Sequence, residues 1–212
     1  MAIYYIADLH LGHENVIRFD KRPFNNIQEM EKVIVSNWNN RVHQDDTVYV
    51  LGDFAWAKEN EWLPILAKFK GQINLIRGNH DPKQFSNSTR RLLHDIKDYK
   101  EIHDSGRQVI LCHYPIPFYK HSNKDKYYML YGHVHNTREN DFLEKLKNEV
   151  AASCSEPGHS KAHFINVGCM MPWMDYTPRT LDEIIAGERH YSQQADKIVT
   201  SLNHGDIFPR SR

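Results

Sequence analysis

The segment Tyr-Gly-His-Val-His contains two histidines, His133 and His135, that are two positions apart. Their side chains and their spacing would allow them to act on the same ligand. Residues at i and i+2 of an extended segment point to the same face, so both imidazoles could reach one point in space. A solvated, histidine-rich loop is the simpler interpretation of this pair alone. A metal site is the alternative, because neutral imidazole is the commonest protein ligand for metals.

Similar side chains follow five predicted strands. The apolar runs over 2–7, 47–51, 73–77, 108–112 and 127–131 are followed in turn by Asp8 and His10, by Asp53, by Asn79, His80 and Asp81, by His113, and by His133 and His135. Taken singly, such residues more often make a turn or bond the backbone. In open α/β sheets, however, the loops at the carboxyl ends of the strands converge on the ligand. The common position of these residues therefore predicts one site.

Seven of these residues offer two carboxylates, one carboxamide and four imidazoles, which is too many ligands for one cation. They are Asp8, His10, Asp53, Asn79, His113, His133 and His135. The set suits two divalent ions about 3.5–4 Å apart, bridged by a shared carboxylate and a solvent oxygen. Nitrogen and oxygen ligands without thiolate favour Mn, Fe, Zn, Ni or Co over Ca or Mg. Such an ion pair attracts phosphate and acidifies a water that can attack phosphorus.

The elements that must position these residues alternate along the chain. In addition to the five strands, the apolar patterns predict strands over 99–103 and 163–168 and helices over 25–42, 58–69, 83–97, 140–153 and 180–189. Strands alternating with helices indicate an α/β domain with substantial parallel sheet. We expect one domain over 1–190 and a peripheral C-terminal tail over 191–212, with a helix and a frayed end.

Composition narrows the class of protein. The 212 residues carry 27 Lys and Arg against 27 Asp and Glu, so net charge does not indicate a nucleic-acid partner. No apolar run of about 18 residues could span a bilayer, and the start of the chain lacks the basic region of a signal peptide. The 3 cysteines form no Cys-x-x-Cys pair, which favours a reducing compartment and a cytoplasmic location. The composition leaves the oligomeric state open.

The motifs resemble, in order, those of the calcineurin-like metallophosphoesterases, and of a compact prokaryotic and phage subgroup in particular. They are Asp8-Leu9-His10, Gly52-Asp53, Gly78-Asn79-His80-Asp81, His113 and Gly132-His133-Val134-His135. The resemblance implies a four-layer α/β/β/α sandwich with two mixed β-sheets and the metals at the central rim. It also implies a dinuclear metal-dependent phosphoesterase. Manganese is the favoured metal, with Fe, Zn, Ni and Co as the other candidates.

The resemblance also implies a role for each residue. One ion would be held by Asp8, His10, Asp53 and His135, and the second by Asp53, Asn79, His113 and His133. After attack by a metal-bridging hydroxide, His80 would act as the general acid that protonates the leaving oxygen, with Asp81 orienting its ring. The expected substrate is a small phosphate ester or nucleotide. A phosphodiester is preferred because the small chain lacks an obvious capping domain over the site.

Several residues near the motifs have two interpretations. His13 and Asn15 either contact the substrate or cap the next segment. Arg18 and Arg22 either clamp a phosphate or belong to the solvated surface. The segment over 113–121 either walls the pocket and stacks a base or covers apolar core, and the segment over 172–178 is a candidate dimer contact.

Two other functions fit the same residues. A non-catalytic scaffold or interaction module of this fold predicts degraded motifs, whereas every motif is intact here. A nuclease that acts on single-stranded nucleic acid would use the same chemistry, but the balanced charge counts against it.

Overall fold

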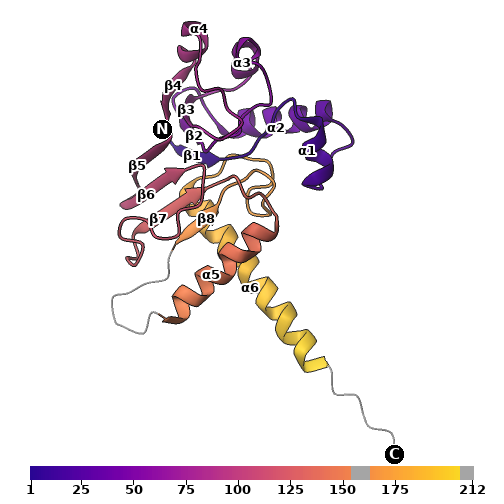
Figure 1. The fold of residues 1–212 in the computed structure, drawn as a ribbon, viewed down its shortest axis with the longest axis vertical. Coiled ribbons are helices and arrows are strands. Elements are labelled where there is room, and N and C mark those ends of the chain that lie inside the picture. Colours follow the sequence, from indigo (N-terminus) through magenta and orange to yellow (C-terminus); the bar gives the residue numbers. More distant parts are fainter. Residues whose placement is uncertain (154–162, 206–212) are drawn as a thin grey trace, which may run out of the picture.

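The computed structural model describes residues 1–153 and 163–205, which form two four-stranded sheets with helices outside them (Figure 1). The first sheet has the order β1-β2-β3-β4, with all three neighbouring pairs parallel. Its strands are β1 (Ile3–Ile6), β2 (Thr47–Val50), β3 (Gln72–Ile76) and β4 (Leu93–Lys97). Nearly every residue of β1, β2 and β3 is buried, as expected of parallel strands that are covered on both faces.

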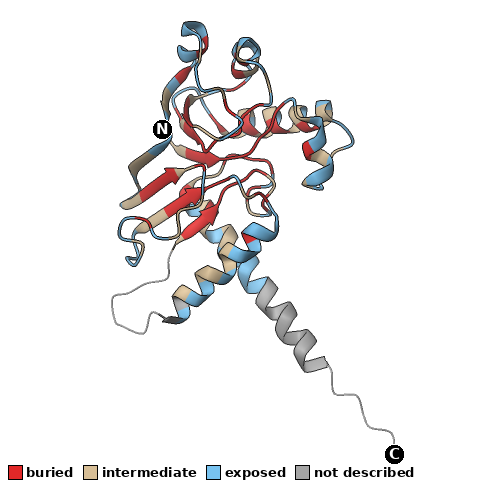
Figure 2. Ribbon diagram, viewed as in Figure 1, coloured by how far each residue is buried: buried red, intermediate tan, exposed pale blue. Residues whose placement is uncertain are grey.

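The second sheet has the order β5-β6-β7-β8, in which β5 runs antiparallel to β6 and the other pairs are parallel. Its strands are β5 (Tyr99–Asp104), β6 (Arg107–Cys112), β7 (Tyr127–Tyr131) and β8 (Phe164–Asn166). One apolar cluster takes side chains from both sheets, for example Val50 and Leu75 from the first and Leu111 and Leu130 from the second. The two sheets therefore pack face to face on a shared core, and Figure 2 shows the buried residues concentrated in their strands.

The helices complete the outer layers. On the side of the first sheet lie α1 (Glu14–Phe19), α2 (Ile27–Arg41), α3 (Glu59–Leu66) and α4 (Asn87–Arg90), and on the side of the second lie α5 (Arg138–Ser153) and α6 (Leu181–Gly205). The side chain of Asn26 caps α2 by accepting a hydrogen bond from the amide of Glu29 at 2.9 Å. The same helix buries Met30, Ile34 and Trp38 against the core.

The predicted four-layer α/β sandwich is confirmed. Within residues 1–153 and 163–205, the strands of the first sheet are parallel throughout and meet an antiparallel partner only at an isolated bridge between Tyr5 and Arg179. The second sheet is mixed. The helix predicted over 83–97 is wrong, because this segment forms the short α4 and the edge strand β4. Only Leu93 of β4 is buried, so the segment carried too few apolar residues to separate a helix from an edge strand.

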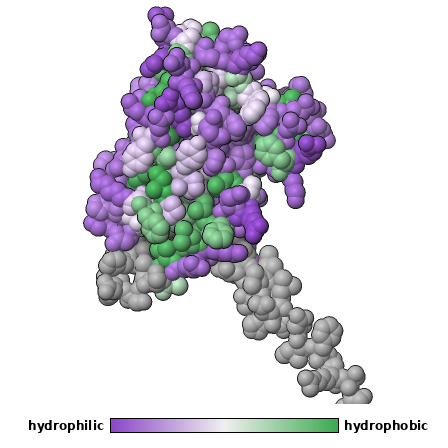
Figure 3. Space-filling view, in the orientation of Figure 1, coloured by the Kyte–Doolittle hydropathy of each residue, from purple (hydrophilic) through white to green (hydrophobic). Residues whose placement is uncertain are grey.

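The C-terminal part begins on the core and continues as one long helix. Leu181 and Ile184, in the first turn of α6, are buried. The predicted boundary at 190 falls inside α6, and the division into domain and tail stays a prediction; residues 206–212 of that tail lie outside the described ones. Of the helices that the structure describes, none combines the length and the apolarity needed to cross a membrane. In Figure 3 hydrophobic side chains gather around the second sheet, while the surface over α3 and α4 is mainly hydrophilic.

Candidate metal centre

The loops that follow β1, β2, β3, β6 and β7 meet at one rim of the sandwich and bring the seven predicted ligands together. Two groups of their ligand atoms lie within 4.8 Å of one another, namely Asp8, His10 and His135, and Asp8, Asp53 and His113. All five of these side chains belong to buried residues. Both sheets contribute, because His113 and His135 follow strands of the second sheet and the others follow strands of the first.

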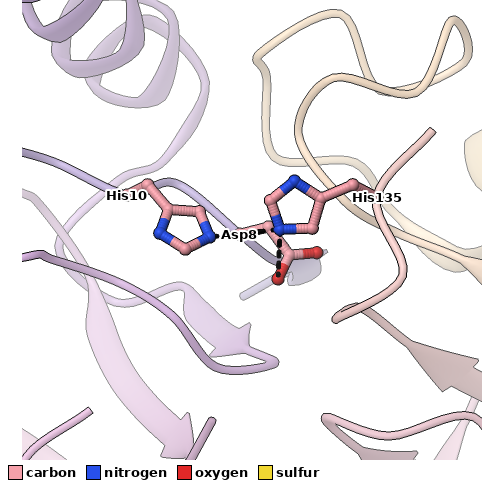
Figure 4. Close-up of side chains that lie close together, drawn as sticks. All are labelled: Asp8, His10 and His135. Carbon is pink, nitrogen blue, oxygen red and sulfur yellow. Dashed lines mark hydrogen bonds and ion pairs between the residues drawn. The ribbon is translucent and has the colours of Figure 1, made fainter. Parts of the chain in front are cut away.

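The first cluster is centred on two imidazole nitrogens that face each other. Nε2 of His10 lies 3.2 Å from Nε2 of His135, although the two residues are 125 positions apart in the sequence. Figure 4 shows the two rings arriving from separate loops, with the carboxylate of Asp8 beside them. Nε2 of His135 is 4.0 Å from Oδ1 of Asp8, and Nε2 of His10 is 3.6 Å from Oδ2 of Asp53. These four side chains are the set expected for the first ion.

The second cluster surrounds the carboxamide of Asn79. Its Oδ1 lies 3.0 Å from Nε2 of His113 and 2.9 Å from Nδ1 of His133. Nε2 of His113 is 3.6 Å from Oδ2 of Asp53, the same oxygen that lies 3.6 Å from His10. Asp53 thus stands between the clusters, in the place expected of a bridging carboxylate. The other ring nitrogen of His113 contacts the carbonyl of Leu51 at 2.8 Å, which places a proton on Nδ1 and leaves Nε2 as a lone-pair donor.

Five of the ligand residues have left-handed backbone conformations. Their φ angles are 56° at Asp8, 51° at His10, 51° at Asp53, 69° at His133 and 50° at His135. A non-glycine residue in this region costs on the order of 1–3 kcal/mol, and such strain concentrates at functional sites. The finding also replaces one sequence interpretation. The two histidines after β7 are not in an extended segment, and the turn sends their rings to different clusters.

Two of the motif glycines leave room for the carboxylates. A Cβ atom on Gly78 would lie 2.2 Å from Oδ1 of Asp53, and one on Gly132 would lie 2.6 Å from Oδ2 of Asp8. Both distances are far inside van der Waals contact, so any larger residue would push a carboxylate out of the cluster. These glycines belong to the motifs for steric reasons.

The charges of the two clusters fit divalent cations. Asp8 and Asp53 are buried, and burial is the main cause that raises the pKa of Asp8. Over the described residues, neither carboxylate has a Lys or Arg ion-pair partner. Burial also lowers the pKa of His10 to about 2, so this imidazole is neutral and can donate a lone pair. Buried carboxylates surrounded by neutral nitrogen and amide ligands are the environment that a divalent transition metal requires.

Behind the first cluster lies a carboxylate that no sequence motif indicated. Oδ1 of Asp20, just after α1, is 2.8 Å from Nδ1 of His135. Burial opposes ionisation of Asp20, but the hydrogen bond and the nearby charges of His135 and Arg22 outweigh it and lower its pKa. An ionised acceptor holds a proton on Nδ1 of His135 and directs the lone pair of Nε2 toward the cluster.

Arg22 holds this arrangement in place. Its Nη2 lies 2.9 Å from Oδ2 of Asp20, and the guanidinium also donates to the carbonyls of Asp8 and Leu9. Arg22 is only 4% exposed, so it is neither a phosphate clamp nor solvated surface. Arg18, in contrast, is exposed, and its suggested contact with phosphate stays a prediction.

We expect Asp20→Asn to weaken metal binding by about 10- to 100-fold, because removal of a carboxylate behind a ligating histidine has effects of this size. The amide keeps the shape of the side chain but can present its NH₂ group to His135, which favours the wrong tautomer. Competition with a chelating dye would measure the affinity for Mn²⁺ and Zn²⁺. Asp125→Asn, the same change at an exposed residue, is the matched control. An unchanged affinity in the Asp20 variant would contradict the role given to this carboxylate.

His80 lies beside both clusters on the loop after β3. Its residue is exposed, its backbone amide donates to Oδ1 of Asp53 at 3.0 Å, and its ring centre is 5.7 Å from that of His10. This position allows the ring to meet a molecule that arrives from solvent.

Asp81 has different contacts from those expected. Its carboxylate accepts hydrogen bonds from the backbone amides of Asp53, Phe54 and Gly78 at 2.8–3.0 Å. Burial raises its pKa to about 6. These hydrogen-bond partners of the carboxylate are backbone groups and not the His80 ring, so Asp81 ties the loop after β2 to the loop after β3.

The other residues suggested as substrate contacts lie partly beside the site and partly in the core. His13 occupies the N-cap position of α1 but makes no side-chain capping bond, and its ring instead stacks on Trp56. Asn15 is exposed on α1, and a substrate contact there stays a prediction. In the segment over 113–121, Tyr114 packs against His133 while Tyr119 is buried, so this segment both borders the site and covers the core.

The segment over 172–178 is largely internal. Met174 and Tyr176 are buried, and the indole of Trp173 donates to the carbonyl of Asn166 at 2.8 Å. A dimer contact by this segment stays a prediction.

The chain is similar to a known protein family and to individual proteins of archaeal, phage and bacterial origin. Residues 1–182 match the sequence profile of the calcineurin-like phosphoesterase superfamily domain. An uncharacterized protein of Methanocaldococcus jannaschii, MJ1445, is 34% identical over 155 residues, which cover 71% of this chain and 80% of that protein. The gene 66 protein of Mycobacterium phage L5 is 28% identical over 81 residues, which cover 37% of this chain and 39% of that protein.

A solved structure of similar fold comes from Aquifex aeolicus. It is a protein of unknown function, AQ665, that superposes with a TM-score of 0.62 at 29% identity. The superposition covers 87% of this chain and 97% of that protein. The fold is therefore shared over nearly the whole of the Aquifex aeolicus protein.

Proposed function

Since this chain belongs to the calcineurin-like phosphoesterase superfamily, we propose that it hydrolyses phosphodiesters, with two divalent metal ions as cofactors and His80 as the general acid. The observation that carries the proposal is the pair of ligand clusters that share Oδ2 of Asp53. Each cluster combines nitrogen and oxygen ligands, and we propose Mn²⁺ as the preferred ion.

In the proposed hydrolysis, different residues of the chain orient the metal ligands, hold the loops and transfer the proton. Two bound divalent ions would attract the phosphate and lower the pKa of a water that supplies the attacking oxygen. Asp20 and Leu51 fix the tautomers of His135 and His113, so that each presents a lone pair to the site. Asp81 and Asp53 hold the loop that carries His80 through backbone amides. His80 would then give a proton to the leaving oxygen, and general-acid catalysis of this kind contributes about 10²- to 10⁴-fold.

The preference for diesters rests on the open side of the site. Asn79, His80 and His133 are exposed, so the phosphorus of a substrate could carry a substituent on either side. Over the described residues no additional domain covers the rim, which agrees with a substrate larger than a simple monoester.

The proposal is tested by hydrolysis of bis-p-nitrophenyl phosphate and p-nitrophenyl phosphate before and after removal of metal. We expect the chelated protein to be inactive, two equivalents of Mn²⁺ to restore turnover, and the diester to be the better substrate. A protein that binds two ions but hydrolyses neither compound would instead support the non-catalytic scaffold. Metal-independent hydrolysis would contradict both functions.

A further inference from the structure

A hollow of about 520 Å³ lies next to the metal centre and shares only Asn79 with the seven expected ligands. It is lined by Trp56, Ala57, Lys58, Glu61, Asn79 and His80. Its volume is within the range of about 300–1,000 Å³ that small-molecule sites occupy. Two of the lining residues also belong to the site itself, so the hollow is continuous with the place where the phosphate would bind.

Trp56 forms an aromatic wall of this hollow. Its residue is 48% exposed, whereas Trp38 and Trp62 are fully buried. The ring of His13 lies parallel to the indole at a centroid distance of 4.4 Å and an interplanar angle of 13°, and the His80 ring lies 4.7 Å away. Trp56 and His80 line the hollow, and His13 is not among its lining residues. These contacts fix the ring while part of it stays accessible.

The polar groups around the hollow are few. The Lys58 ammonium has no ion-pair partner within the part of the chain that the structure describes, and Lys58 and Glu61 are both exposed. One carboxylate oxygen of Glu61 accepts a hydrogen bond from the backbone amide of Lys58 at 2.8 Å. This bond fixes the start of α3 beside the hollow. An aromatic wall with one cation and one carboxylate at its edge is suited to a flat heteroaromatic ring with polar edges.

From this geometry we infer that the hollow is a binding subsite for a nucleobase on the leaving group, stacked on Trp56. The inference rests on the proposed function, because it takes His80 as the proton donor to the leaving oxygen. The substrate is then a phosphodiester whose leaving alcohol is a nucleoside. The oxygen of water bonds to phosphorus, the bond from phosphorus to the nucleoside oxygen breaks, and that oxygen takes the proton of His80. The proton released from water replaces it through solvent.

The test compares a dinucleotide with two analogues that each lack one base. The phosphodiester and the leaving hydroxyl are the same in all three, so only stacking differs. With the manganese-loaded protein we expect kcat/KM to fall by about 5- to 150-fold when the base on the leaving side is missing, as stacking on an aromatic side chain contributes that much. The ratio of kcat/KM for the dinucleotide to kcat/KM for the analogue without the leaving-side base should approach one in Trp56→Ala. In Trp56→Phe this ratio should lie between one and the value of the unmodified protein. Phe142→Ala, which removes a 71% exposed ring from α5, should leave the ratio as in the unmodified protein.

Binding provides a second measurement that does not depend on turnover. Adenosine should quench tryptophan fluorescence saturably in the unmodified protein and in Phe142→Ala, and not in Trp56→Ala. Hydrolysis at equal kcat/KM of the dinucleotide and both analogues would overturn the subsite while leaving the phosphodiesterase intact. If no dinucleotide is hydrolysed, the proposed function fails, and adenosine binding then decides the subsite alone. Quenching that is the same with and without Trp56 would overturn it.

Discussion

Replacement of Asp53 by asparagine is expected to lower kcat/KM for a phosphodiester by on the order of 10³-fold, or about 4 kcal/mol. Oδ2 of Asp53 lies 3.6 Å from ligand nitrogens of both clusters, so one substitution affects both ions. An amide nitrogen at this position has no lone pair for a cation, and the site also loses one negative charge. Metal analysis after dialysis should show fewer than two ions per chain.

The control for this experiment is Asp45→Asn, the same change at an exposed aspartate before β2. This variant should keep both its metal content and its activity. Both proteins should have circular dichroism spectra like that of the unmodified protein, because Oδ1 of residue 53 can still accept the backbone amide of His80. If Asp53→Asn keeps full activity, the bridging role is wrong.

Replacement of His80 by alanine is expected to have an effect that depends on the leaving group. For an ester with an alkyl leaving group, loss of the general acid should lower kcat by about 10²- to 10⁴-fold. For p-nitrophenolate, which leaves without protonation, the loss should be much smaller. The metal content should not change, because His80 is outside both ligand clusters.

The matched control is His94→Ala, which removes an exposed histidine of β4. It should have no effect on either substrate. Equal losses for the two leaving groups in His80→Ala would indicate that His80 binds the phosphate and does not transfer a proton. No loss for either would exclude it from the reaction.

The sequence predicted the parts of the site that have a local signal. Asp8, Asp53 and His113 each follow a short apolar run, and the carboxyl ends of parallel strands meet at one edge whatever the details of packing. The alternation of strands and helices predicted an α/β domain with parallel sheet, and the resemblance to the family implied the four-layer sandwich. The error over 83–97 arose because an edge strand buries too few side chains to show a period of two.

The contacts around the ligands had no such signal. Asp20 meets His135 across 115 positions, and no spacing in the sequence connects a residue after a short helix with a distant turn. The resemblance implies that Asp81 orients the His80 ring, yet the fold presents three backbone amides to its carboxylate. Trp56 had no pattern that separates a partly exposed indole from a core one. These contacts depend on how the loops approach each other, which periodicity does not encode.

The ligands of each candidate ion come from both sheets, and this links the stability of the sandwich to the supply of metal. An unfolded chain cannot gather Asp8, Asn79 and His135, so the ions bind the native state selectively. A ligand at one hundred times its dissociation constant stabilises the native state by about 2.7 kcal/mol, and two ions add their effects. The bound ions would therefore cross-link the two sheets. The resistance of the protein to heat and to proteases would then rise with the free metal concentration. When metal is scarce, the protein would lose stability as well as activity.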